Sequence, residues 1–154
     1  MKRLPKGFTL LMTFFLFAPL LSIHAQIANE MDEALELERM TYAQAARFVL
    51  AASETLPADT SADQAFAYAQ EQKWISGDAQ AGGAITLGAL SLLIMKSFDI
   101  KGGFMYALFP SGRYAYRSLV RRGFIQGFAD PALTVSGDRF FLILGKALSY
   151  KGDV

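Results

Sequence analysis

This sequence lacks most of the side chains on which enzymes and metal sites depend. The 154-residue chain has no cysteine, and its one histidine, His24, lies in a leader-like N-terminal segment. The rest of the chain therefore has no thiolate nucleophile, no imidazole base and no His/Cys metal site. Only carboxylates, Lys, Tyr, Ser and Thr remain for catalysis. We expect a protein that is not an enzyme and that carries no cofactor and no metal.

Long hydrophobic runs are also missing after the N-terminus. The longest later run, Leu87–Met95, is shorter than the ~20 apolar residues of a membrane-spanning helix and is typical of a buried one. The N-terminal run Phe8–Leu21 follows a basic start and precedes the small residue Ala25. This pattern is typical of a secretory signal peptide over residues 1–25, and the alternative is an uncleaved membrane anchor.

Charge of one sign is not in large excess either. Three of the 15 basic residues (Lys2, Arg3 and Lys6) lie in the leader, which leaves 12 Lys and Arg against 14 Asp and Glu. A chain so near neutrality has no global positive field, so we expect no nucleic-acid partner. We expect a periplasmic or cell-envelope location, with membrane association only if the leader is retained.

The sequence does contain a repeated pattern. Lys73-Trp74-Ile75-Ser76-Gly77 and Gly123-Phe124-Ile125-Gln126-Gly127 share an aromatic-Ile-x-Gly signature at a period of 50 residues. A helical pattern precedes each copy, and a second apolar helix follows from Thr86 or Ser136. Repetition at such a period indicates one supersecondary unit that is used more than once. The predicted fold class is all-α, with repeated helix-loop-helix units after the signal peptide.

The pattern divides the chain into three parts. Residues 1–25 are the signal peptide, 26–39 an acidic helical N-terminal segment, and 40–150 a helical repeat domain. Cap residues and apolar periodicity predict the helices of this domain at 41–53, 62–73, 86–98, 113–122 and from Ser136 onward. The apolar stretch Phe104–Phe109 is expected to form one helical turn that closes over the core.

The order of these elements resembles the S-layer homology (SLH) domain family. Helices that open at Thr41, Thr86 and Ser136 alternate with two helices that end in the aromatic-Ile-x-Gly turn, over about residues 40–148. The resemblance implies a helical module of the cell envelope. In that family the opening Thr is followed by Arg-x-Glu. The resemblance implies that these charged positions bind anionic wall polymer. Here they read Tyr42-Ala43-Gln44, Leu87-Gly88-Ala89 and Gly137-Asp138-Arg139, so these contacts do not carry over.

The best candidate site is a stripe of arginines. Arg113, Arg117 and Arg121 recur every four residues and so project from one helix face, with Tyr114 and Tyr116 beside them. Guanidinium forks bind phosphates and carboxylates, so the stripe predicts a site for a lipid phosphate, a wall polymer or an acidic protein. The alternative is a solvated face with intramolecular ion pairs, for example to the acidic residues 30–38.

Other candidates have a structural explanation that we favour. Trp74 and Phe124 could stack on sugar rings, but their equivalent positions at helix ends indicate core residues. Asp130 and Asp138 could form a catalytic carboxylate pair, but a turn and a helix start are where Asp is expected. Gly102-Gly103 is read as a connector.

The sequence thus predicts an exported, non-catalytic binding or structural module whose partner is a cell-envelope polymer or an envelope protein. Its oligomeric state is open. One alternative is a hydrolase or transferase that uses carboxylates alone. Another is a subunit of a larger periplasmic or membrane-anchored assembly, for which an exposed apolar patch at Phe104, Met105, Phe109 and Phe128 would be the sign.

The leader itself gives the first testable prediction. Because residues 1–25 have the order of a signal peptide, protein isolated from the envelope fraction should begin at or near Gln26. Intact mass and N-terminal sequencing check this. A full-length product held in the inner membrane would contradict it and support the anchor.

Overall fold

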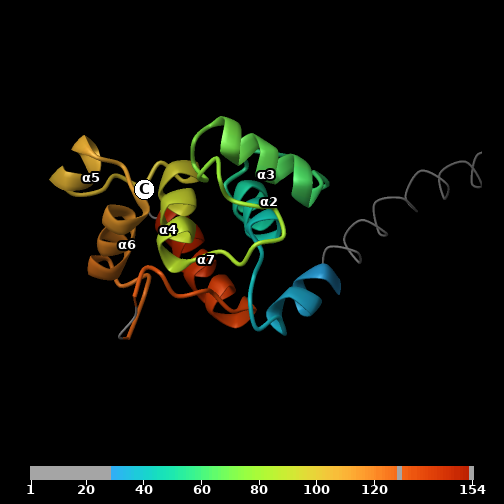
Figure 1. The fold of residues 1–154 in the computed structure, drawn as a ribbon. Coiled ribbons are helices and arrows are strands. Elements are labelled where there is room, and N and C mark those ends of the chain that lie inside the picture. Colours follow the sequence, from blue (N-terminus) through green and yellow to red (C-terminus); the bar gives the residue numbers. More distant parts are fainter. Residues whose placement is uncertain (1–28, 128–129, 153–154) are drawn as a thin grey trace, which may run out of the picture. The chain divides into compact units, whose positions relative to one another are not determined.

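The computed structural model describes residues 29–127 and 130–152, and the regular secondary structure within these ranges is all helical. Residues 29–35 form one helix. The others are α2 (Tyr42–Ala52), α3 (Ala62–Glu71), α4 (Leu87–Ser97), α5 (Phe104–Leu108), α6 (Gly112–Arg121) and α7 (Gly137–Gly152) (Figure 1). The predicted all-α class is confirmed. The predicted signal peptide lies outside the described residues.

The chain separates into two compact units, Met1–Ala34 and Leu35–Val154. Helices α2 to α7 belong to the second unit. Within it, α4 packs against both α6 and α2, while α3 and α7 pack on α2. Helix α5 packs mainly on α6, beside which it lies in Figure 1.

Side-chain caps define where the early helices of the second unit begin. The Thr41 hydroxyl accepts from the Gln44 N–H at 3.2 Å, and the Gln44 side chain accepts from the Thr41 N–H at 3.1 Å. Ser61 and Gln64 form the same reciprocal box before α3, and the Thr86 hydroxyl accepts from the Ala89 N–H. Each cap satisfies amide groups that have no partner within the helix, which is worth about 1 kcal/mol. The helix starts predicted at Thr41 and Thr86 are confirmed, and Ser61 caps the helix predicted over residues 62–73.

Three buried segments that precede helices join in a closed ring of hydrogen bonds. The Met40 N–H donates to the Val135 carbonyl at 2.8 Å, and the Ile85 N–H donates to the Met40 carbonyl at 2.9 Å. The Val135 N–H completes the ring by donating to the Ile85 carbonyl at 3.1 Å. All three side chains are fully buried. We call these bonds the central ring; it joins the starts of α2, α4 and α7.

A second layer of backbone bonds surrounds the central ring. The Tyr42 N–H donates to the Gly83 carbonyl, the Leu87 N–H to the Leu133 carbonyl, and the Gly137 N–H to the Leu37 carbonyl, all at 2.8–2.9 Å. Each first helical residue is therefore held by the segment that leads into the next of the three helices. Amides at helix starts have no intrahelical acceptor, so these bonds satisfy groups that would otherwise be buried without partners.

The apolar core lies around the central ring. Leu90, Leu93 and Ile94 of α4 are buried, as are Leu50 of α2 and Leu119 of α6. The start of α7 adds an aromatic cluster, in which Phe140 and Phe141 contact Phe48 of α2 at ring-centre distances of 6.1 and 5.2 Å. Helices α2, α4, α6 and α7 thus share one core.

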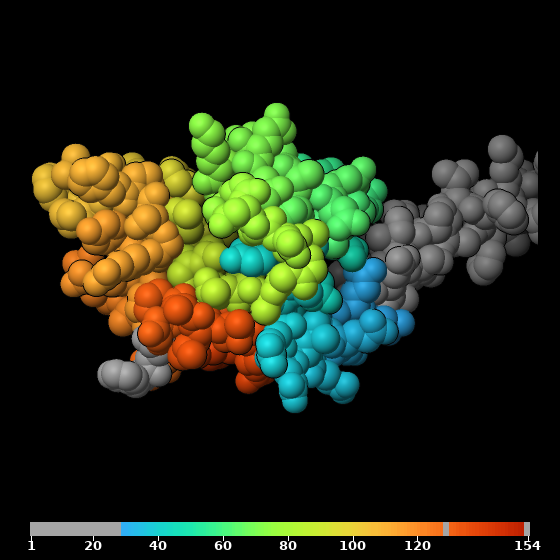
Figure 2. Space-filling view, in the orientation of Figure 1, coloured from blue at the N-terminus to red at the C-terminus, as the bar shows by residue number. Residues whose placement is uncertain are grey.

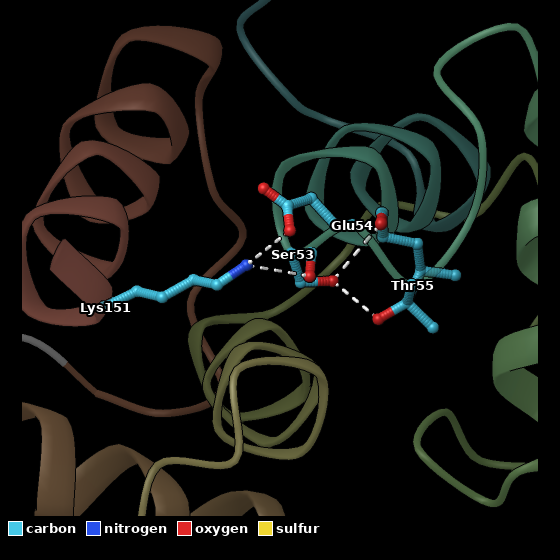
Figure 3. A network of polar contacts seen from close by, with 5 residues as sticks. Ser53, Glu54, Thr55 and Lys151 are labelled. Atoms are coloured by element: carbon cyan, nitrogen blue, oxygen red, sulfur yellow. Dashed lines mark hydrogen bonds and ion pairs between the residues drawn. The ribbon is translucent and has the colours of Figure 1, made fainter. Parts of the chain in front are cut away.

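A polar network ties the end of α7 to the end of α2 (Figure 3). The Lys151 ammonium donates to the Ser53 carbonyl at 3.2 Å and lies 3.2 Å from the Glu54 carboxylate. The Ser53 hydroxyl also lies 2.8 Å from the Thr55 hydroxyl. Because the Glu54 side chain is largely exposed, the ion pair adds little stability, and the bond to the Ser53 carbonyl fixes the position of α7.

Three predictions about elements were wrong in part. The acidic segment is helical only over 29–35, and a turn and bends follow. Phe104–Phe109 does form a short helix, but no α5 residue is buried, so it does not close over the core. Leu148, which apolar periodicity places on the inner face of the helix predicted from Ser136 onward, is 44% exposed. The burial of a short apolar stretch without cap residues is hard to predict from sequence, because tertiary packing decides whether other segments cover it.

The shared core makes a matched pair of substitutions informative. Phe140→Ala should lower the free energy of unfolding by about 3–5 kcal/mol, because it opens a cavity in a fully buried aromatic cluster. Leu142→Ala on the same helix removes a side chain that is 58% exposed and should cost far less. Urea unfolding measures both.

A fragment of residues 40–100 lacks Val135 and so cannot close the central ring. We expect it not to melt cooperatively. A cooperative transition of this fragment would contradict a core shared between the two repeats.

Candidate functional site

The three arginines of the predicted stripe lie on the exposed face of α6. Arg113, Arg117 and Arg121 are all exposed, while Ala115, Ser118 and Leu119 of the same helix are buried. Within the described part of residues 35–152, no carboxylate lies within ion-pair distance of these guanidinium groups. The predicted common face of the three arginines is thus confirmed, and no ion pair within the described part of residues 35–152 neutralises their charge.

Arg122, which follows the stripe, has a structural role instead. It donates to the Lys101 carbonyl at 2.6 Å and to the Tyr150 hydroxyl at 3.2 Å, and it lies 5.2 Å from the centre of the Tyr150 ring. These contacts tie the end of α6 to the loop before α5 and to α7. Arg122 is therefore committed to the fold, unlike the three stripe arginines.

Four of the five predicted site residues lie in one cleft between α5 and α6, which we call the α5–α6 cleft. Its volume is about 410 Å³. The predicted site residues in its wall are Tyr114, Tyr116, Arg117 and Arg121, and Phe104, Met105 and Tyr106 form the opposite side. Figure 2 shows the gold and orange surfaces of α5 and α6 side by side. The cleft combines aromatic surface with two guanidinium groups.

Two glycines shape the loop that leads to this cleft. A Cβ atom on Gly103 would lie 2.7 Å from the Arg121 guanidinium, and one on Gly102 would overlap the Tyr106 ring. The absence of side chains there leaves room for both groups. Gly102-Gly103 is therefore more than the simple connector that the sequence predicted.

Tyr106 contributes a polar group that has no partner in the described part of the chain. Its hydroxyl is buried and makes no hydrogen bond. Burial, with a smaller effect of the Asp99 carboxylate, raises the pKa of this phenol, so it stays protonated. The Lys96 ammonium lies 5.9 Å from the centre of the ring. A buried phenol of this kind can serve as a donor or acceptor to a ligand.

The fifth predicted residue, Arg113, lies in a different groove, which we call the Trp74 groove. Its volume is about 390 Å³. Tyr42, Trp74 and Leu92 supply its apolar surface, and Thr86 and Arg113 its polar groups. It thus lies where the α3–α4 loop meets the starts of α2, α4 and α6. The arginine stripe therefore spans two clefts and is not one site.

Two glycines let the Trp74 groove form. A Cβ atom on Gly112 would lie 2.9 Å from the Gly88 carbonyl, and one on Gly88 would lie 3.2 Å from the Pro131 carbonyl. Only glycines allow the first turns of α4 and α6 to approach this closely. This contact places Arg113 at the groove, and no sequence pattern identified it.

The aromatic side chains of the groove are held by their neighbours. Trp74 packs edge-on against Tyr68 at 5.9 Å, and Tyr42 against Phe66 at 6.5 Å. Burial raises the pKa of the Tyr42 phenol, so it is neutral at physiological pH. Trp74 is partly exposed at the groove, whereas Phe124 is buried against Tyr150. The core assignment is thus confirmed for Phe124 only.

The two aspartates considered for catalysis serve the backbone. The Asp130 carboxylate accepts from the Ala132 N–H at 2.8 Å in a turn. Asp138 accepts from the Ser136 hydroxyl, which lowers the pKa of its carboxyl group. A catalytic acid needs its pKa raised, so this shift has the wrong sign. Among the described residues, no cluster of three His, Cys, Asp or Glu side chains could hold a metal ion.

The sequence also predicted an exposed apolar patch as the sign of a protein partner. Phe104, Met105 and Phe109 are indeed exposed, by 76%, 44% and 62%, whereas Phe128 lies outside the described residues. Within the described ranges, none of the helices has the length and hydropathy of a membrane span.

Comparisons with known proteins found no match, so any function has to be inferred from the residues of this chain. No protein-family model matches the sequence, no curated protein matches it, and no solved structure matches the chain.

The exposed arginines of α6 give a prediction for stability. Changing Arg113, Arg117 and Arg121 together to Gln should alter the free energy of unfolding by no more than about 0.5 kcal/mol per site, because the side chains are exposed and have no ion-pair partner among the described residues. Arg122→Gln should destabilise more, since it removes two hydrogen bonds. Urea titration compares them, and a larger loss from the triple variant would show that the stripe supports the fold.

Proposed function

We propose that this chain is an exported, non-catalytic binding module of the cell envelope, similar in organisation to SLH domains, that attaches to an anionic envelope polymer. The observation that carries the proposal is the Trp74 groove. It combines two aromatic faces with a guanidinium group at the point where three helix starts meet.

The chemistry of this groove fits a sugar polymer that bears phosphate or carboxylate groups. The partly exposed ring of Trp74 offers a flat apolar face for a sugar ring, and the phenol of Tyr42 can donate a hydrogen bond. Arg113 can form paired hydrogen bonds with an anionic substituent. Apolar walls with a few fixed polar groups are usual for small-molecule and sugar sites.

The central ring supports the likeness to SLH domains. The segments that close it, Met40-Thr41, Ile85-Thr86 and Val135-Ser136, contain the helix openings that form one part of the resemblance, beside the two aromatic-Ile-x-Gly turns. Their cyclic bonding is the arrangement expected when equivalent units surround an axis. None of the three openings is followed by the Arg-x-Glu motif. In this proposal Arg113, which comes from α6, supplies the cationic group at the groove instead.

Binding to purified cell-wall sacculi tests the proposal. Wild-type protein should co-sediment with sacculi that carry their anionic polymers, and added salt should weaken the binding. Trp74→Leu and Arg113→Gln should each reduce binding about five- to thirtyfold, because a stacking face and an ion pair in a partly closed site are worth roughly 1–2 kcal/mol each.

Arg39→Gln is the matched control. It removes one exposed cation that lines neither cleft, so it should change sacculus binding little. If wild-type protein fails to sediment with sacculi, or if the two groove variants bind like the control, the proposed function is wrong.

A second candidate function is a subunit of a larger periplasmic or membrane-anchored assembly that binds protein. The exposed apolar side chains of α5 favour it, because a soluble monomer rarely leaves such a cluster in water. A pull-down from envelope extract that recovers one stoichiometric protein, and that fails with Phe104→Ser, would support this candidate.

A further inference from the structure

The α5–α6 region concentrates positive charge that the rest of the chain balances. Residues 100–129 contain five basic residues and neither Asp nor Glu, although the whole chain is nearly neutral. The five are Lys101, Arg113, Arg117, Arg121 and Arg122, and all are exposed. The nearest acids along the chain are Asp99 and Asp130, one on either side of the segment. The region therefore presents a local positive field.

The same region exposes the largest apolar side chains of the second unit. Phe104 and Phe109 are 76% and 62% exposed, and Met105 and Leu108 are 44% and 54% exposed. All four belong to α5 or the residue after it, and α5 packs mainly on α6. Each of these groups costs free energy in water, so the surface indicates an apolar environment in its working state.

We propose that α5 and the adjacent face of α6 bind the surface of an anionic phospholipid bilayer. Phe104 and Phe109 would enter the boundary between headgroups and acyl chains. Arg117 and Arg121 would bind lipid phosphates at the α5–α6 cleft, and its tyrosines would lie at headgroup depth. This inference is independent of the Trp74 groove, and it differs from the sequence-based expectation that only a retained leader brings the chain to a membrane.

The side-chain chemistry favours a bilayer over a protein partner. Protein interfaces also combine aromatic side chains with Arg, but five basic residues with no acid between them are typical of a surface that binds anionic lipid. A bilayer surface offers a partner for both kinds of group, with anionic phosphates outside and hydrocarbon beneath. Long cationic side chains can reach the phosphates while their stems remain in apolar contact.

Vesicle co-sedimentation tests the proposal with two lipid compositions. Wild-type protein should sediment with vesicles of phosphatidylethanolamine and phosphatidylglycerol, and much less with vesicles of neutral phosphatidylcholine. Added salt should weaken the binding, since it screens the attraction. Every variant carries the same N-terminus, so any contribution of the leader is common to all of them.

Two double variants separate the apolar and ionic parts of the surface. Phe104→Ser with Phe109→Ser should weaken binding by roughly tenfold or more, because two aromatic side chains no longer leave water. Arg117→Gln with Arg121→Gln should weaken binding about fivefold for each cation removed and lower its salt dependence. Leu142→Ser is the matched control, since Leu142 is 58% exposed on α7 and lines neither cleft.

A fluorescent variant reports the depth of insertion. The chain has one tryptophan, Trp74, which is outside this surface. The wild-type emission should stay unchanged on anionic vesicles. In Phe104→Trp the emission should shift to shorter wavelength and be quenched by brominated lipids.

Several outcomes would overturn the proposal. One is the absence of sedimentation with anionic vesicles, and another is vesicle binding that the α5 double variant leaves intact. A concentration-dependent dimer that Phe104→Ser with Phe109→Ser abolishes, without vesicle binding, would assign the surface to a second copy. Capture of one envelope protein through α5, again without vesicle binding, would assign it to that partner. Loss of sacculus binding alone would contradict the proposed function and would not affect the proposal of bilayer binding.

Discussion

Closure of the central ring is the constraint on which the second unit depends. Three segments separated by 45 and 50 residues along the chain exchange single hydrogen bonds in a cycle, with Met40, Ile85 and Val135 fully buried. Each of the three bonds joins two segments and leaves a buried amide that only the third segment can pair, and an unpaired amide in the core costs about 1–3 kcal/mol. Helices α2, α4 and α7 each begin two residues after a ring position, so the ring sets where they start and how they face one another.

The two clefts follow from this arrangement. The ring places the start of α4, and the first turn of α4 meets the first turn of α6 through Gly88 and Gly112. The Trp74 groove opens at this junction. Helix α6 then carries its arginines away from the ring, from Arg113 in the groove to Arg121 beside α5. One helix therefore serves two surfaces of different chemistry, an aromatic groove suited to a sugar polymer and an apolar, cationic face suited to a bilayer.

The sequence predicted the local features well and the tertiary ones poorly. Caps at Thr41, Ser61 and Thr86 are encoded within four residues, and the spacing of Arg113, Arg117 and Arg121 fixes their common face, so both were readable. Whether Phe104 is covered depends on chain segments elsewhere, and there the prediction was wrong. The division of the stripe between two clefts rests on the close approach of Gly88 and Gly112, which no periodicity reveals. One signal was overlooked: the absence of acidic residues over 100–129 is plain in the sequence and marks the cationic face.

Native-state hydrogen exchange of the ring amides tests the central claim most directly. If the ring closes the fold, the Met40, Ile85 and Val135 amides exchange only when the whole unit unfolds. The three should therefore report one common free energy of opening, equal to the global free energy of unfolding from urea titration, and Phe140→Ala should lower all three together. Exchange of the Val135 amide at a distinctly lower free energy than that of Met40 or Ile85 would show that α7 opens independently, and it would contradict the ring as the element that holds the unit together.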